Sequence, residues 1–299
     1  MDKKKNVSLL PLVMRVLGYL LGAGILGIPV TSGLVGVIPA LVLMTALMLT
    51  MFYSGSIIAE EVIETKDPTF NFPSLYNKYF GTIGKWISIL ANLIILYGLI
   101  IAYLVGGSKL FTKFFDIESF WAKKLVLLVF FSILTAMCIK GIELVKKCNI
   151  IFVSLLWIAF IALVAIGAAY ISPEHYLYTD LSIIPMAAPI ILTSFFFHNI
   201  IPNISYNSGW NIKIVNKAMF IALLIGLLLN ALWFLIGVGV LPLNQGKMSI
   251  EYAYIHNYPT LTPMTEIIKN PAFMIFAMTF GFIAIITSFF GNGLGRMGF

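Results

Sequence analysis

The first part of the chain whose residue types suggest chemistry is a run of glycines ending in a proline, Gly22 to Pro29 (GAGILGIP). Glycine weakens a helix interior and proline has no N–H to donate, so we expect this run to unwind and free backbone groups. Freed N–H groups bind a carboxylate and freed carbonyls bind an ammonium or cation, which together suit a zwitterion. The groups available belong to Gly22, Ala23, Gly24 and Ile25. The alternative is that these glycines only allow close packing of a neighbouring helix.

A second stretch, Phe195 to Asn203 (FFFHNIIPN), is expected to interrupt a later apolar segment that also contains Pro185 and Pro189. Paired interruptions in corresponding positions are typical of inverted-repeat transporters, whose binding site lies between two broken helices near the middle of the bilayer. We therefore predict that the two stretches form one binding site. The candidate residues in the second stretch are Phe195, Phe197, His198 and Asn199.

Each of these side chains has an ordinary structural alternative. The aromatic faces of Phe195 and Phe197 could stack on an aromatic ligand, although core or lipid-facing phenylalanines have the same pattern. His198 titrates near neutrality and could carry a proton or hydrogen-bond a ligand, whereas a histidine with satisfied hydrogen bonds would be structural. Tyr103 shares a helical face with Asn92, and its hydroxyl could reach a bound carboxylate, unless it is an interfacial tyrosine.

The elements that must position these residues are membrane-spanning helices. The chain has 299 residues, of which 60% are apolar and 10% charged, with a mean hydropathy of +1.00, which excludes a water-soluble globular domain. A bilayer core of about 30 Å needs about 20 apolar residues per helix. The apolar runs predict eight spans, near 9–31, 37–59, 84–108, 122–139, 149–171, 183–205, 217–241 and 271–294. Two longer loops are expected, Glu60 to Ile83 inside and Pro242 to Asn270 outside.

The distribution of basic residues predicts how the chain sits in the membrane. With a cytoplasmic N-terminus, thirteen of the 19 Lys and Arg residues fall on the cytoplasmic side, as the positive-inside rule favours. This topology explains the formal charge of +7, so we expect no nucleic-acid partner. The first apolar run is longer than a signal-peptide core and is interpreted as an uncleaved first span.

Three local matches carry a resemblance to a known family. They are Gly22 to Pro29, then Thr193 to Pro202 (TSFFFHNIIP), close to a Thr-Ser-Phe-Gly-Phe-His-x-x-Ile-Pro pattern, and then Ala284-x-x-Thr287-Ser288 before Gly291. The chain resembles the hydroxy and aromatic amino acid permeases, the tryptophan and tyrosine permease family of the amino acid, polyamine and organocation superfamily. It departs from the pattern at Phe196, where the family usually has glycine, and we expect the larger side chain to stiffen or narrow this break.

The resemblance implies an all-α polytopic fold of inverted repeats with discontinuous first and sixth helices. We expect one transmembrane domain over residues 1–299, with a first repeat at about 9–171 and a partial second repeat at about 183–299. Members of the family have about eleven spans, so the second repeat is incomplete. Either the sequence is a truncated permease, which we favour, or a shortened homologue completes its bundle with another chain.

The function implied by the resemblance is secondary active uptake of a neutral, aromatic amino acid such as tryptophan or tyrosine across the cytoplasmic (inner) membrane. The family uses protons, which His198 could carry; sodium is the alternative, with Ala284, Thr287 and Ser288 as its candidate site. Thr287 and Ser288 could equally bond to carbonyls of their own helix. The rival hypothesis is a non-transporting scaffold or amino acid sensor. We expect no cofactor, no metal site and no enzyme activity, because no catalytic or metal-binding motif is present.

Overall fold

The computed structural model describes residues 8–20, 22–67, 70–139, 142–244 and 246–294. Every named element in these residues is a helix, and their only extended pairing is an isolated antiparallel bridge between Gly36 and Thr179. The predicted all-α polytopic class is therefore confirmed. The division into two inverted repeats stays a prediction.

Seven helices in the described part are long and apolar enough to cross a membrane, or eight when a bent pair near the N-terminus counts as one span. The count agrees with the eight spans expected from the apolar runs. The longer helices are α1 (Leu9–Leu20), α3 (Val37–Thr65), α4 (Phe72–Phe114), α5 (Phe120–Ile139), α6 (Ile142–Gly167), α7 (Ile184–Ser194), α9 (Ile212–Val240) and α12 (Pro271–Leu294). The shorter ones are η1 (Ala23–Gly27), α2 (Ile28–Gly33), η2 (Ala168–Tyr170), η3 (Pro173–Tyr176), η4 (Leu181–Ile183), η5 (His198–Ile200), α8 (Ile201–Asn207), η6 (Gly246–Met248), α10 (Ile250–Ile255) and α11 (Leu261–Ile268).

The two segments expected to be long loops are largely helical, so that prediction was wrong. α3 continues to Thr65, and α4 already begins at Phe72, where the Asn71 side chain accepts a hydrogen bond from the Ser74 backbone N–H at 3.0 Å. α4 kinks at Gly81, whose φ of 63° favours glycine. The other segment contains η6, α10 and α11. A helix can form without an apolar run, for example where a side chain caps its first turn, so hydropathy alone did not find the helical parts of these two segments.

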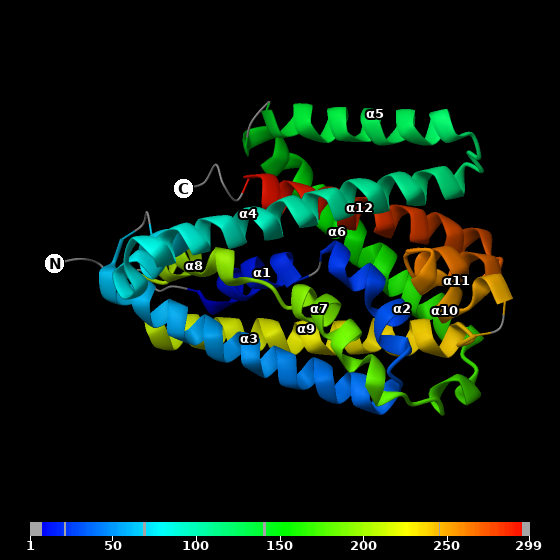
Figure 1. Cartoon of the computed structure of the whole chain (residues 1–299), viewed down its shortest axis with the longest axis horizontal. Helices are drawn as coiled ribbons and strands as arrows, with labels where there is room; N and C mark the ends of the chain where they lie inside the picture. Colours follow the sequence, from blue (N-terminus) through cyan, green and yellow to red (C-terminus); the bar gives the residue numbers. More distant parts are fainter. Residues whose placement is uncertain (1–7, 21, 68–69, 140–141, 245, 295–299) are drawn as a thin grey trace.

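α9 packs against α1, α2 and α3, while α12 packs against α6 and α4. Figure 1 shows α5 as the outermost helix on one side, next to α4. The exposed faces of α4 and α5 are rich in large apolar side chains, including Trp86, Ile101, Trp121 and Leu125. Such a surface suits lipid rather than water. The same packing holds the two interrupted spans against α3, α9 and α12.

Candidate functional site

The first span is interrupted at the predicted glycine run. α1 ends at Leu20, η1 takes up Ala23–Gly27, and the two halves of the span are bent by 44°. The tight 3₁₀ winding leaves backbone groups outside the α-helical hydrogen-bond pattern. Two of these groups form hydrogen bonds with residues far away in the sequence. The Ala23 N–H donates to the Ser288 hydroxyl at 2.8 Å, and the Leu26 carbonyl accepts from the Thr260 N–H at 3.1 Å.

The sixth span is interrupted as well. α7 ends at Ser194, the chain leaves helical geometry at Phe195–Phe197, and η5 then leads into α8. Phe197 has φ −137° and ψ 0°, which no α-helix contains. Pro202 lies in the first turn of α8, where its missing N–H costs no hydrogen bond.

The two interruptions meet in space. A Cβ on Gly24 would lie 3.5 Å from the Cα of Ser194, so the first break touches the end of α7 with only ordinary van der Waals room between them. A Cβ on Gly22 would lie 2.7 Å from the Ser288 hydroxyl oxygen. Glycine at position 22 therefore allows α12 to approach closely enough to pair with the Ala23 N–H. The structure thus brings Gly22, Ala23, Gly24 and Ser288 together with the end of α7.

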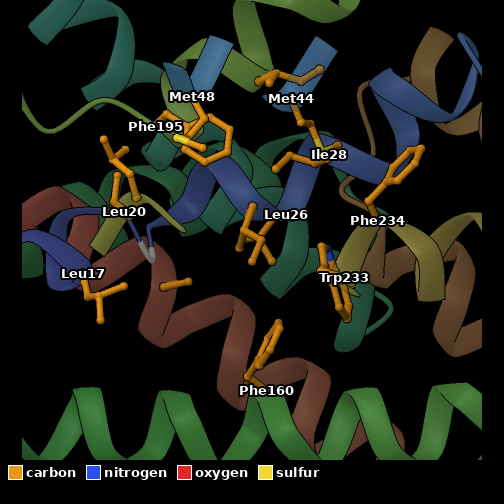
Figure 2. Close-up of a cluster of buried hydrophobic side chains, with 14 of the residues drawn as sticks. Leu17, Leu20, Leu26, Ile28, Met44, Met48, Phe160, Phe195, Trp233 and Phe234 are labelled. Atoms are coloured by element: carbon orange, nitrogen blue, oxygen red, sulfur yellow. The ribbon is translucent and has the colours of Figure 1, made fainter. Parts of the chain in front are cut away.

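Phe195 and Phe197 are both fully buried, each with 0% of its surface exposed. Figure 2 shows Phe195 beside Met48 of α3, with Leu26 directed toward Trp233 and Phe160. Phe197 lies over Gly55 of α3, where an added Cβ would be 2.7 Å from its ring. In this conformation both rings fill the core between α3 and the second break.

His198 is buried next to these rings. Its Nε2 lies 2.8 Å from the hydroxyl oxygen of Ser54 in α3, and its Nδ1 has no hydrogen-bond partner among the described residues. The ring also stacks on Phe196, with centroids 5.7 Å apart. Phe196 itself is half-buried and replaces the glycine of the family pattern, so its bulk is accommodated beside the imidazole. Asn199 is half-buried in the same turn.

The candidate residues of α12 and α4 divide between the break and the surrounding packing. The Thr287 hydroxyl donates to carbonyls of its own helix, to Ile283 at 2.8 Å and Ala284 at 3.2 Å. Ser288 faces the first break instead. Tyr103 is half-buried where α4 packs on α12, near Phe289. Ser288 contacts the first break directly, through its hydrogen bond to the Ala23 N–H.

Three polar residues that sequence reasoning did not select also lie here: Ser54, Ser194 and Asn230. The Asn230 amide nitrogen donates to the Ser194 hydroxyl oxygen at 3.3 Å, and both residues are buried. Their signal in the sequence is only that each is a polar residue inside an apolar span. Spacing along the chain could not have paired them, because they come from different helices.

Comparison with known proteins agrees with this architecture. A family model described as the tryptophan/tyrosine permease family matches residues 5–299. The chain belongs to the tryptophan/tyrosine permease family. It is similar to tyrosine-specific transport systems 1 and 2 of Haemophilus influenzae, at 30% identity over 95% of this chain and 70% of the relative, and at 29% over 94% and 70%. It is also similar to glutamine transporter 2 of Aliivibrio fischeri, at 23% identity over 96% and 73%.

Membership of this permease family makes the chain a multi-pass membrane protein of amino acid transport rather than an enzyme. The resemblance identified from Gly22–Pro29, Thr193–Pro202 and the α12 motif is therefore confirmed. Two of these three stretches are the ones that break their helices and meet in the folded permease.

Proposed function

We propose that this permease is a secondary active transporter of neutral aromatic amino acids, with tyrosine as its first substrate. The observation that carries the proposal is the meeting of the two broken spans, where Gly24 lies against Ser194. Unwound backbone at mid-membrane offers N–H groups to a carboxylate and carbonyls to an ammonium. The names of the two Haemophilus influenzae relatives support tyrosine as the substrate.

The substrate would bind between the breaks, with the backbone of Gly22, Ala23, Gly24 and Ile25 on its charged groups. Phe195, Phe197, His198 and Asn199 would form the other wall, and the Tyr103 hydroxyl would complete it. Phe195 and Phe197 fill the core in this conformation. Alternating access therefore requires that one or both rings turn away as the substrate enters.

The coupling ion we propose is a proton carried by His198. The Nδ1 of this buried imidazole meets no partner in the described part of the chain and can accept a proton, while Ser54 fixes the ring through Nε2. Sodium at Ala284, Thr287 and Ser288 is the alternative. It is less favoured because the Ser288 oxygen already accepts from the Ala23 N–H, whereas the Thr287 oxygen, whose proton goes to its own helix, keeps lone pairs that a cation could use.

The membrane we propose is the cytoplasmic (inner) membrane, with the N-terminus inside and the spans arranged as two inverted repeats. The positive-inside distribution of Lys and Arg supports this orientation. Labelling of single cysteines introduced at the N-terminus and at Lys123, near the start of α5, tests it in intact cells. The N-terminal cysteine should resist an impermeant thiol reagent, and the cysteine at position 123 should react.

The deciding experiment is uptake of radiolabelled tyrosine, tryptophan and glutamine by proteoliposomes with imposed gradients. A proton gradient directed into the vesicles (acidic outside) should drive accumulation of tyrosine, and a protonophore should abolish this accumulation. A sodium gradient that drives uptake at equal pH would replace the proton in the proposal. Saturable tyrosine binding without accumulation under either gradient would favour the scaffold or sensor alternative.

His198→Gln separates coupling from binding. This variant keeps a side chain of similar size with hydrogen-bonding groups but cannot carry the proton. We expect it to exchange tyrosine across the membrane while losing accumulation driven by the pH gradient. Full gradient-driven accumulation by His198→Gln would remove His198 from the coupling mechanism.

A further inference from the structure

One face of α9 follows the broken first span along its length. Residues Gly226, Asn230, Trp233 and Gly237 are spaced by four, three and four positions, which places them on a single helix face. At one end Gly226 lies against Leu20, where an added Cβ would be 2.9 Å from its side chain. At the other end Gly237 contacts Pro29. Asn230 and Trp233 therefore lie opposite the unwound stretch between these two contacts.

The orientation of the Asn230 amide follows from its hydrogen bonds. The Ser194 hydroxyl donates to the Ile191 carbonyl at 2.7 Å, which uses its only proton. Its oxygen can then only accept, so the amide must present nitrogen to it, at 3.3 Å. The amide oxygen Oδ1 points away from Ser194, and it has no partner among the described residues although Asn230 is only 1% exposed.

Leaving the Asn230 amide oxygen unpaired in an apolar core is unfavourable. The cost is recovered only in a state in which a hydrogen-bond donor reaches this oxygen. In this conformation no described N–H group of the first break donates to the Asn230 amide oxygen. Of the two charged groups of an amino acid, only the ammonium donates hydrogen bonds, whereas a carboxylate would be repelled by an amide oxygen. Asn230 bonds to Ser194, and Gly24 of the first break lies against the same residue, so the Asn230 amide lies near the meeting point of the two broken spans.

We propose that Asn230 Oδ1 binds the ammonium group of the substrate amino acid, with Ser194 as the positioning residue that holds the amide in this orientation. The inference rests on the proposed function, because it needs an amino acid between the two breaks. It adds a binding residue from α9 to a site otherwise built from the first and sixth spans. It also predicts that the permease selects strongly for a free α-amine.

The test compares tyrosine with its deaminated analogue, 3-(4-hydroxyphenyl)propionate. In proteoliposomes, the KM for tyrosine and the inhibition constant of the analogue give a selectivity ratio for the amine. Asn230→Leu keeps the volume but removes the acceptor, and we expect it to lower this ratio about 10-fold or more, as loss of a hydrogen bond to a charged group does. Asn230→Asp keeps an acceptor oxygen and should retain the ratio.

Asn216→Leu is the matched control. Asn216 lies on the same helix and also has an amide oxygen that no described residue pairs with, but it is fourteen residues earlier, about 21 Å along the axis. It should leave the ratio unchanged. The inference is overturned if Asn230→Leu keeps the wild-type ratio, if Asn216→Leu lowers it equally, or if Asn230→Asp loses it while transporting.

Failure of the proposed function has a different signature. If the wild-type chain accumulates glutamine instead of tyrosine, the substrate assignment is wrong, and the same variants are compared with glutamine and 4-carbamoylbutanoate. If the wild-type chain accumulates none of the three amino acids, the transport proposal fails before any variant is compared, and this inference fails with it. Should Asn230→Leu not fold, loss of amine selectivity in Ser194→Ala, which frees the amide to turn, supports the proposal, and retained selectivity contradicts it.

Discussion

The Ser288 hydroxyl oxygen lies 2.8 Å from the backbone nitrogen of Ala23, so a side chain of α12 pairs with the break in a span that lies 265 residues earlier. An unwound segment in a membrane protein is tolerated only where its backbone groups find partners or face a cavity. Ser288 supplies one such partner at the point where α1 ends. The contact ties the position of the first break to that of α12.

The first prediction removes this contact. Ser288→Ala leaves the Ala23 N–H without its partner and should lower the free energy of unfolding by about 1 to 3 kcal/mol, measured by denaturation of the purified protein in detergent. Thr287→Val is the control, since the Thr287 hydroxyl bonds only within its own helix. We expect a smaller loss for Thr287→Val. Equal losses for the two variants would contradict a capping role for Ser288.

The second prediction concerns Gly22. A Cβ there would lie 2.7 Å from the Ser288 oxygen, so Gly22→Ala should push that side chain off the Ala23 N–H and reduce tyrosine uptake several-fold. Gly18→Ala adds a Cβ where nothing lies within 4 Å and should leave uptake close to wild type. In a Ser288→Ala background the clash is gone, so adding Gly22→Ala should reduce tyrosine uptake little further. If Gly22→Ala reduced uptake as much in that background as in the wild-type chain, the Ser288 side chain would not be the reason that position 22 requires glycine.

The third prediction concerns a contact between the two broken spans away from the breaks. The Arg15 guanidinium of α1 donates to the side-chain oxygen of Asn203 in α8 at 2.6 Å, on an exposed surface. Asn203→Asp turns this contact into an ion pair, worth about 1 kcal/mol or less at an exposed position. If α1 and α8 separate during transport, the stronger tie should lower the maximal uptake rate at low salt with little change in KM. An unchanged rate would mean that they move together.

The fourth prediction tests packing of the second break against α3. Gly55→Ala places a Cβ 2.7 Å from the fully buried ring of Phe197, and such overpacking costs about 1 to 3 kcal/mol of unfolding free energy. Phe197→Leu in the same chain should recover part of that loss, because the smaller side chain makes room. Gly98→Ala, which meets nothing within 4 Å, is the control and should be neutral or stabilising. If the unfolding free-energy changes of Gly55→Ala and Phe197→Leu simply added in the double variant, the side chains at positions 55 and 197 would not be in contact.

The sequence by itself determined which segments cross the membrane and where two of them break. These are local properties, because about 20 apolar residues span a bilayer core and because glycine and proline weaken a helix at their own positions. The family resemblance followed from the same two stretches and the α12 motif, and it is confirmed. Helical segments outside the apolar runs, such as the start of α4 and α10–α11, were missed because they carry no comparable hydropathy signal.

Only the tertiary structure decided which groups pair across the bundle. Ser288 reaches Ala23, Thr260 reaches the Leu26 carbonyl, and Asn230 reaches Ser194, although every pair is widely separated along the chain. No local pattern specifies such partners, because they depend on how rigid helices pack against one another and on which glycines let them approach. The direction of Phe195 and Phe197 into the core was decided in the same way, by the space that α3 leaves at Gly55 and beside Met48.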